Sequence, residues 1–78
     1  MTLLQYMQNH SSSGNLEIIG FTGAPAICER LHEMGLHQGQ VITLVGRAPL
    51  RGPLLIQFGT SFVALRAEEA QCTLIQAR

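Results

Sequence analysis

A cysteine and a histidine with helical spacing are the first candidates for chemistry in this chain. Cys28 and His32 are four residues apart, so on a helix both side chains would lie on one face, where a nucleophile and a base could meet. Such a pair also needs an orienting group and oxyanion donors, and the chain contains no Asp to serve as the usual third partner. We therefore interpret Cys28 as a buried thiol beside a surface His32, and we expect no catalytic residues and no enzymatic activity.

His32 and Glu33, followed by His37, are similar to a zinc-hydrolase motif. In that motif the second histidine follows the first by about four residues, whereas here the interval is five. Gly35 also ends the predicted helix between the two histidines. The imidazoles would then point in different directions, which excludes this class of zinc hydrolase.

A looser metal site is an open alternative, because five potential ligands fall within ten residues: Cys28, Glu29, His32, Glu33 and His37. Imidazole and carboxylate groups both suit divalent iron. Proximity in the sequence does not supply ligand number and geometry, and exposed His and Glu side chains are common on solvated helix faces. We therefore assign no metal ligand and expect no cofactor.

The segment at residues 46–53 is the most unusual in the chain, with two prolines, two glycines and two arginines around Leu50. It does not match a nucleotide-binding loop, which needs a Lys and a following helix. One interpretation is a stiff connection between two strands. The other is a pre-organised surface loop whose Leu50 and flanking arginines contact a partner, and both can hold.

Composition limits the classes of partner. Five Arg balance five Glu, so the formal net charge is zero and offers no attraction for phosphates, which argues against nucleic acid. The longest apolar stretches are far shorter than the roughly 20 residues of a membrane helix. No secretory signal is recognisable, and the only cysteines, Cys28 and Cys72, form no disulfide framework. We therefore expect a cytoplasmic location.

The elements that must position these residues fit one domain of 78 residues. Residues 1–15 are predicted to form one or two helical turns and a polar linker from His10 to Asn15. Residues 16–78 are predicted to form an all-β domain with one short helix, which begins at Pro25 and stops at Gly35. Without crossover helices the strands favour a small five-stranded antiparallel barrel. The predicted strands are residues 16–21, 41–47, 54–58, 61–66 and 72–76, with a single helical turn at 67–71.

A set of short motifs, in order along the chain, resembles the FeoA family of bacterial ferrous-iron uptake across roughly residues 16–75. The resemblance implies an SH3-like barrel in the bacterial cytoplasm that acts as an accessory to FeoB, an inner-membrane transporter with a cytosolic GTP-binding domain. It implies no catalytic residues. The chain departs from the family pattern at Gln38, at Arg51 and in its first fifteen residues. The matching residues are Arg30, Leu31, Met34, Gly35, Leu36, Gly39, Arg47, Ala48, Pro49, Leu50, Gly52, Pro53, Leu54, Val63, Ala64, Leu65, Arg66, Glu69 and Ala70.

The leading hypothesis is a protein-binding module that binds and regulates a FeoB-type transporter. Its predicted contact surface combines the turn at residues 34–36 with the loop at residues 47–53, and Leu36 and Leu50 would be its apolar anchors. The alternative is a metal-sensing, transition-metal-binding domain similar to the C-terminal module of DtxR-type repressors. Self-association and the docking site of the N-terminal segment remain open. The predicted partner-binding residues are Met34, Gly35, Leu36, Arg47, Pro49, Leu50, Arg51 and Pro53.

Overall fold

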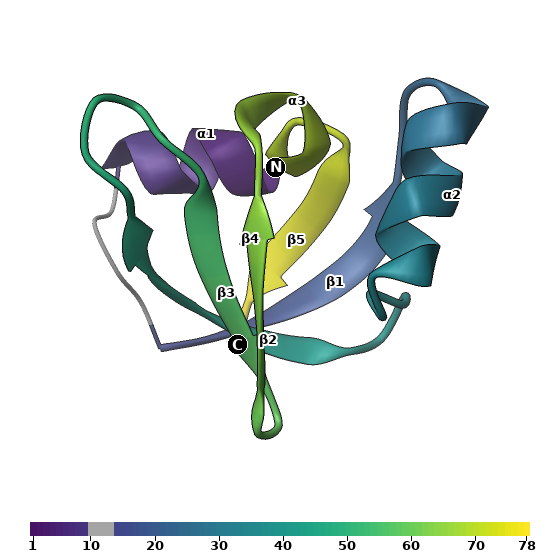
Figure 1. Ribbon diagram of the computed structural model, residues 1–78. Coiled ribbons are helices and arrows are strands. Elements are labelled where there is room, and N and C mark those ends of the chain that lie inside the picture. The colour runs from purple at the N-terminus through teal and green to yellow at the C-terminus, as the bar shows by residue number, and fades with distance from the viewer. Residues whose placement is uncertain (10–13) are drawn as a thin grey trace.

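Five antiparallel strands form a single sheet with the order β4-β3-β2-β1-β5 (Figure 1). The computed structural model describes residues 1–9 and 14–78. The elements, in chain order, are α1 (Leu3–Asn9), β1 (Asn15–Phe21), α2 (Pro25–Glu33), β2 (Val41–Arg47), β3 (Leu54–Phe58), β4 (Ser61–Leu65), α3 (Ala67–Ala70) and β5 (Thr73–Ala77).

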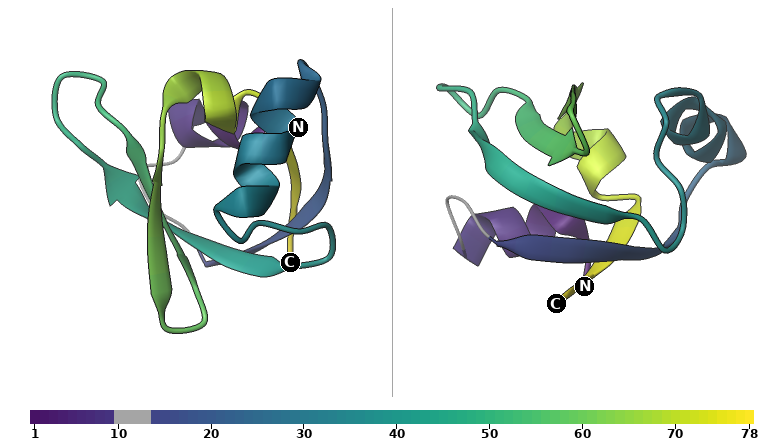
Figure 2. Two further views of the ribbon diagram at one scale, coloured as in Figure 1. Left: turned by 45° about the vertical axis from the view of Figure 1, so that its right-hand side comes forward. Right: turned by 90° about the horizontal axis from the view of Figure 1, so that it is seen from below.

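Alternation of apolar residues places one face of each strand in the core. Leu16 and Ile18 of β1 are buried, as are Ile42 and Leu44 of β2, whereas their neighbours along each strand are more exposed. The register shifts in β1 between Ile18 and Gly20, and a similar shift occurs in β2. Because a bulge bends its strand, these irregularities let one sheet curl around both sides of the core (Figure 2).

The helix α2 begins at Pro25 and ends in a Schellman motif. The Gly35 amide donates to the carbonyl of His32 at 3.0 Å, and the Leu36 amide donates to the carbonyl of Leu31 at 3.1 Å. Gly35 has a φ of 96°, a conformation that glycine adopts without the cost of a Cβ. Leu31 and Leu36 are both buried, so the helix end is held on the core by an apolar pair.

The N-terminal helix α1 packs on the chain's own barrel. Leu3 is completely buried within the same core as the strands. Thr2 forms a β-bridge with Leu74 of β5, and the Ile75 amide donates to the Met1 carbonyl at 2.9 Å. Residues 10–13 of the predicted linker lie outside the described residues, and Asn15 already belongs to β1.

The predicted fold class is confirmed. The predicted and observed bounds of β2 and β3 agree, and those of β1, β4 and β5 differ by one residue at one or both ends. Besides α2, the structure contains the short helices α1 and α3 where isolated helical turns were predicted. The strands β4 and β5 are the two edges of the sheet and are joined through α3. Among the described residues no helix has the length and apolar character to cross a membrane.

Candidate protein-binding surface

Backbone hydrogen bonds close the connection between β2 and β3, which we call the 47–53 loop (Figure 1). The Ala48 amide donates to the Pro53 carbonyl at 2.9 Å, which joins the two ends of the loop. The Gly52 amide lies 3.2 Å from both the Ala48 and the Pro49 carbonyl oxygens. The chain therefore reverses direction in a tight turn.

Leu50 and Arg51, at the tip of this loop, both adopt left-handed backbone conformations, with φ of 60° and 57°. Such a conformation costs a non-glycine residue roughly 1–2 kcal/mol, so it persists only where neighbouring contacts impose it. Arg47 provides such contacts, because its Nε donates to the Gly52 carbonyl at 3.0 Å and its second guanidinium nitrogen to the Arg51 carbonyl at 3.4 Å. The result is a fixed loop that leaves the Leu50 side chain 100% exposed.

Gly52 is required by the close approach of the chain to itself. A Cβ at this position would lie 2.7 Å from the Cβ of Ala48 and 3.1 Å from the carbonyl oxygen of Pro49. The first distance is well below an ordinary contact of about 3.5–4.0 Å between carbon atoms, and the second is a tight carbon–oxygen contact. The loop can therefore keep its shape only with glycine at residue 52.

Three of the five arginines gather around the loop without a carboxylate partner in the described chain. Arg30 pairs with Glu69 at 3.4 Å and Arg78 with Glu17 at 3.9 Å, whereas Arg47, Arg51 and Arg66 form no ion pair among the described residues. These three line two neighbouring open hollows of about 460 Å³ each. The lining residues are Arg51, Gly52, Pro53, Arg66, Ala67 and Glu68 in one hollow, and Leu4, Gln8, Arg47, Arg51 and Ala67 in the other.

A third, mainly apolar hollow lies on the outer face of the sheet. Leu55 pairs with Ala64 across β3 and β4, and both residues are exposed. Phe62, two residues before Ala64 on the same face, is 59% exposed. Sequence reasoning missed this face, although the alternation of Leu55 and Phe62 with inward-facing residues could have revealed it. The hollow is lined by Gly46, Arg47, Ala48, Pro53, Leu55 and Ala64.

The predicted residues of the 47–53 loop lie where a partner can reach them. Pro49, Leu50, Arg51 and Pro53 are exposed. Arg47 is half-buried, and its guanidinium is already engaged by loop carbonyls. Arg47 therefore fixes the loop, while the other four residues form its accessible surface.

The turn at residues 34–36 is positioned differently, and the prediction that Leu36 is a surface anchor is wrong. Leu36 has no exposed surface because the Schellman motif turns it into the core beside Leu31. Met34 is half-buried and packs against the same core. A Cβ added to Gly35 would lie 3.5 Å from the ring of Phe58, so this turn is also close to β3.

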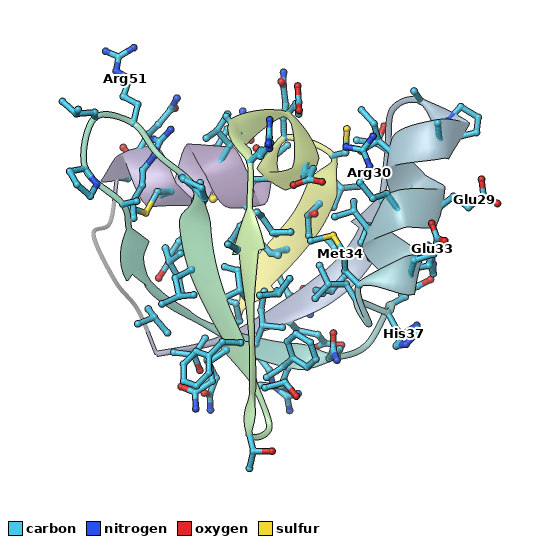
Figure 3. All side chains as sticks on the ribbon, viewed as in Figure 1. Glu29, Arg30, Glu33, Met34, His37 and Arg51 are labelled. Atoms are coloured by element: carbon cyan, nitrogen blue, oxygen red, sulfur yellow. The ribbon has the colours of Figure 1, made fainter. Side chains whose placement is uncertain are left out.

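The two predicted segments do not form one surface. Figure 3 shows Arg51 at the upper left of the molecule, whereas Met34 extends from the end of α2 toward the middle. The two views of Figure 2 also separate α2 from the 47–53 loop. Of the two predicted segments, only the 47–53 loop therefore remains as a candidate binding surface. Arg66 and Ala67 line a hollow beside this loop, and the sequence did not identify them as part of the surface.

The Cys28 and His32 side chains have separate partners. The Nδ1 of His32 lies 2.7 Å from the Cys28 backbone carbonyl, and its ring packs against Phe21 with centroids 4.9 Å apart. The Cys28 Sγ lies 3.6 Å from the Thr22 carbonyl oxygen. Cys28 is half-buried and not fully buried as expected, whereas Cys72 is buried. In the described parts of the chain, no three His, Cys, Asp or Glu side chains are grouped as a metal site would require.

A small curled antiparallel sheet with short helices at its ends defines an SH3-like domain. The model of the FeoA domain matches residues 7–77, and the chain belongs to this family, which is linked to iron transport. No curated protein sequence matches the chain.

Solved structures share the fold. An FeoA-like protein from Clostridium acetobutylicum is 21% identical with a TM-score of 0.82, and the match covers 97% of this chain and 84% of that one. Iron(II) transport protein A from Clostridium thermocellum is 25% identical with a TM-score of 0.81, covering 97% of this chain and 44% of that one. The manganese regulator SloR is 13% identical with a TM-score of 0.82, covering all of this chain and 34% of that regulator.

Proposed function

We propose that this protein is a cytoplasmic, non-enzymatic accessory protein of ferrous-iron uptake, which binds and regulates a FeoB-type inner-membrane transporter through protein–protein contacts. Membership of the FeoA domain family supports the link to iron transport. The observation that carries the proposal is the fixed 47–53 loop, which holds Leu50 fully exposed beside arginines that lack carboxylate partners in the described chain.

The rigidity of the loop favours binding. A loop that is already ordered loses little conformational entropy when a partner binds, so more of the contact energy becomes affinity. Full burial of a leucine side chain contributes about 1.5–3 kcal/mol, and none of that is realised for Leu50 within the described chain. Leu50 is therefore the best-placed apolar anchor on this surface.

The charges around Leu50 indicate the chemistry of the partner's surface. Arg51 and Arg66 are exposed and line one hollow, in which Glu68 is the only acidic residue among the lining side chains. A complementary surface would present an apolar pocket for Leu50, bordered by Asp or Glu. Complementary charges of this kind accelerate association and fix orientation, and salt weakens them.

Calorimetric titration against the cytosolic domain of the cognate FeoB-type transporter tests this function, with and without GTP. The protein should bind saturably, and Leu50→Asp should abolish binding without changing the circular dichroism spectrum, because residue 50 has no buried contacts to lose. The matched control is Gln38→Asp, which adds the same charge at an exposed position beyond α2. Equal binding by the native protein and Leu50→Asp would remove the loop from the proposal.

The likeness to a manganese regulator supports a second candidate, a metal-sensing domain. Its ligands would come from residues such as His32 and His37, whose ring centroids are 6.0 Å apart. Anaerobic titration with ferrous iron discriminates the two candidates. Stoichiometric micromolar binding that is lost in His32→Ala would favour the sensor, and transporter binding without iron binding would favour the accessory protein.

A further inference from the structure

The edge strand β4 lacks the features that normally protect a sheet edge. Its sequence, Ser61–Leu65, contains no charged residue and no proline, and Phe62 is 59% exposed. Natural edge strands are commonly blunted by charges, prolines or bulges, yet the register between β3 and β4 is regular throughout. In Figure 1, β4 lies at the front of the molecule, and no other element is drawn in front of it.

Two residues of β4 have backbone amide and carbonyl groups that do not bond to β3. Gly59 and Thr60 form a two-residue connection, and Phe58 pairs with Ser61 at the first position of the hairpin. Because hydrogen-bonded and non-hydrogen-bonded pairs alternate in an antiparallel ladder, the amide and carbonyl groups of Phe62 and Ala64 face away from β3. Among the described residues, neither forms a backbone hydrogen bond outside the sheet.

We propose that β4 pairs antiparallel with β4 of a second copy of this chain, around a two-fold axis at Val63. In this register Phe62 lies opposite Ala64 of the second copy, and the amide and carbonyl groups of both residues gain partners. The arrangement is isologous, because each copy contributes the same surface. It joins the two sheets into one continuous sheet.

The side chains on the outer face support this register. Phe62 and Ala64 project on the same side as their β3 neighbours Gln57 and Leu55. The phenyl ring of Phe62 from the second copy would therefore lie over the small Ala64 and reach the apolar hollow that Leu55 and Ala64 line. This hollow measures about 420 Å³, whereas an enclosed cavity of about 150 Å³ already holds benzene. Two such insertions, one from each copy, would bury the exposed aromatic face.

Charge also favours a second copy as the occupant. The chain has a formal net charge of zero, so two copies do not repel one another at long range. In the proposed register Arg66 lies opposite Thr60 of the second copy, so no like charges face each other across the new strand pair. The pairing uses none of Pro49, Leu50 or Arg51, although Arg47 and Pro53 of the 47–53 loop also line the hollow that receives the ring. The dimer is therefore measured in the absence of the transporter domain, so that its failure and the failure of transporter binding are distinguishable.

Sedimentation equilibrium of the full chain over a concentration series tests the pairing. The native protein should show a monomer–dimer equilibrium, and Phe62→Glu should raise the dimer dissociation constant at least about tenfold, because it removes the inserted ring and places a charge in the contact. Ala64→Pro should do the same by removing a donor that β3 does not use. The control Val45→Glu changes an exposed apolar residue of β2 outside the contact and should leave the dimer intact.

Hydrogen exchange measured by NMR provides a second readout that does not depend on variants. The amides of Phe62 and Ala64 should become more protected as the protein concentration rises, while that of Val63 should not change. A native protein that is monomeric at all concentrations would overturn the proposal, as would a dimer that survives both substitutions. Protection of these two amides only on addition of the transporter's cytosolic domain would also overturn it and would assign the edge to that partner.

Discussion

The stiffness of the 47–53 loop can be tested at Gly52, where the structure leaves no room for a side chain. In Gly52→Ala the new Cβ would lie 2.7 Å from the Cβ of Ala48 and 3.1 Å from the Pro49 carbonyl oxygen. Both neighbours belong to short or rigid groups that cannot rotate away, so the backbone must move. Such overpacking costs about 1–3 kcal/mol.

The assay is urea and thermal denaturation of the native protein and Gly52→Ala, followed by calorimetric titration of both against the transporter's cytosolic domain. For a domain of this size each kcal/mol corresponds to a fall of about 4–8 °C in Tm. The displaced loop should also bind more weakly, because the backbone conformations of Leu50 and Arg51 depend on the same turn.

Gly46→Ala is the matched control, because nothing lies within 4 Å of a Cβ at that position. This variant should change the free energy of unfolding by less than about 1 kcal/mol, since it adds a methyl group in open space. Equal stability and equal transporter binding in Gly52→Ala and the native protein would refute the description of the loop as rigid and pre-organised.

Two further substitutions separate the core from the binding surface. Leu36→Ala should reduce the free energy of unfolding by about 2–5 kcal/mol in chemical denaturation, because Leu36 is completely buried beside Leu31. A loss below about 0.5 kcal/mol would mean that Leu36 is exposed in solution, as a surface residue would be. Arg51→Gln should slow association with the transporter's cytosolic domain in stopped-flow measurements and weaken its salt dependence, because Arg51 is an exposed charge beside Leu50. An unchanged salt dependence would contradict an acidic border on the partner's surface.

The sequence predicted the strands well because their signal is local. Apolar residues alternate along β1, β2 and β3, and glycines and prolines mark their ends, so the bounds follow from a period of two. The start of α2 at Pro25 and its stop at Gly35 are equally local signals. The exposed loop around Leu50 was also predicted correctly, since its composition suits a surface connection.

The remaining features depend on long-range geometry. An apolar residue after a helix-ending glycine can be exposed or buried, and only the Schellman contact with Leu31 places Leu36 in the core. The distance between that turn and the 47–53 loop depends on how far the sheet curls, to which the register shifts in β1 and β2 contribute. Likewise, nothing local predicts that Leu3 completes the core of the barrel.

A two-dimensional NMR titration of the ¹⁵N-labelled protein with the cytosolic domain of the FeoB-type transporter tests the proposed binding surface most directly. The amide signals of Leu50, Arg51, Gly52 and Ala67 should shift or broaden in a saturable way, while that of Gln38, beyond α2, should not change. Saturable shifts confined to residues of α2, or the absence of any shift at saturating transporter domain, would contradict binding through the 47–53 loop.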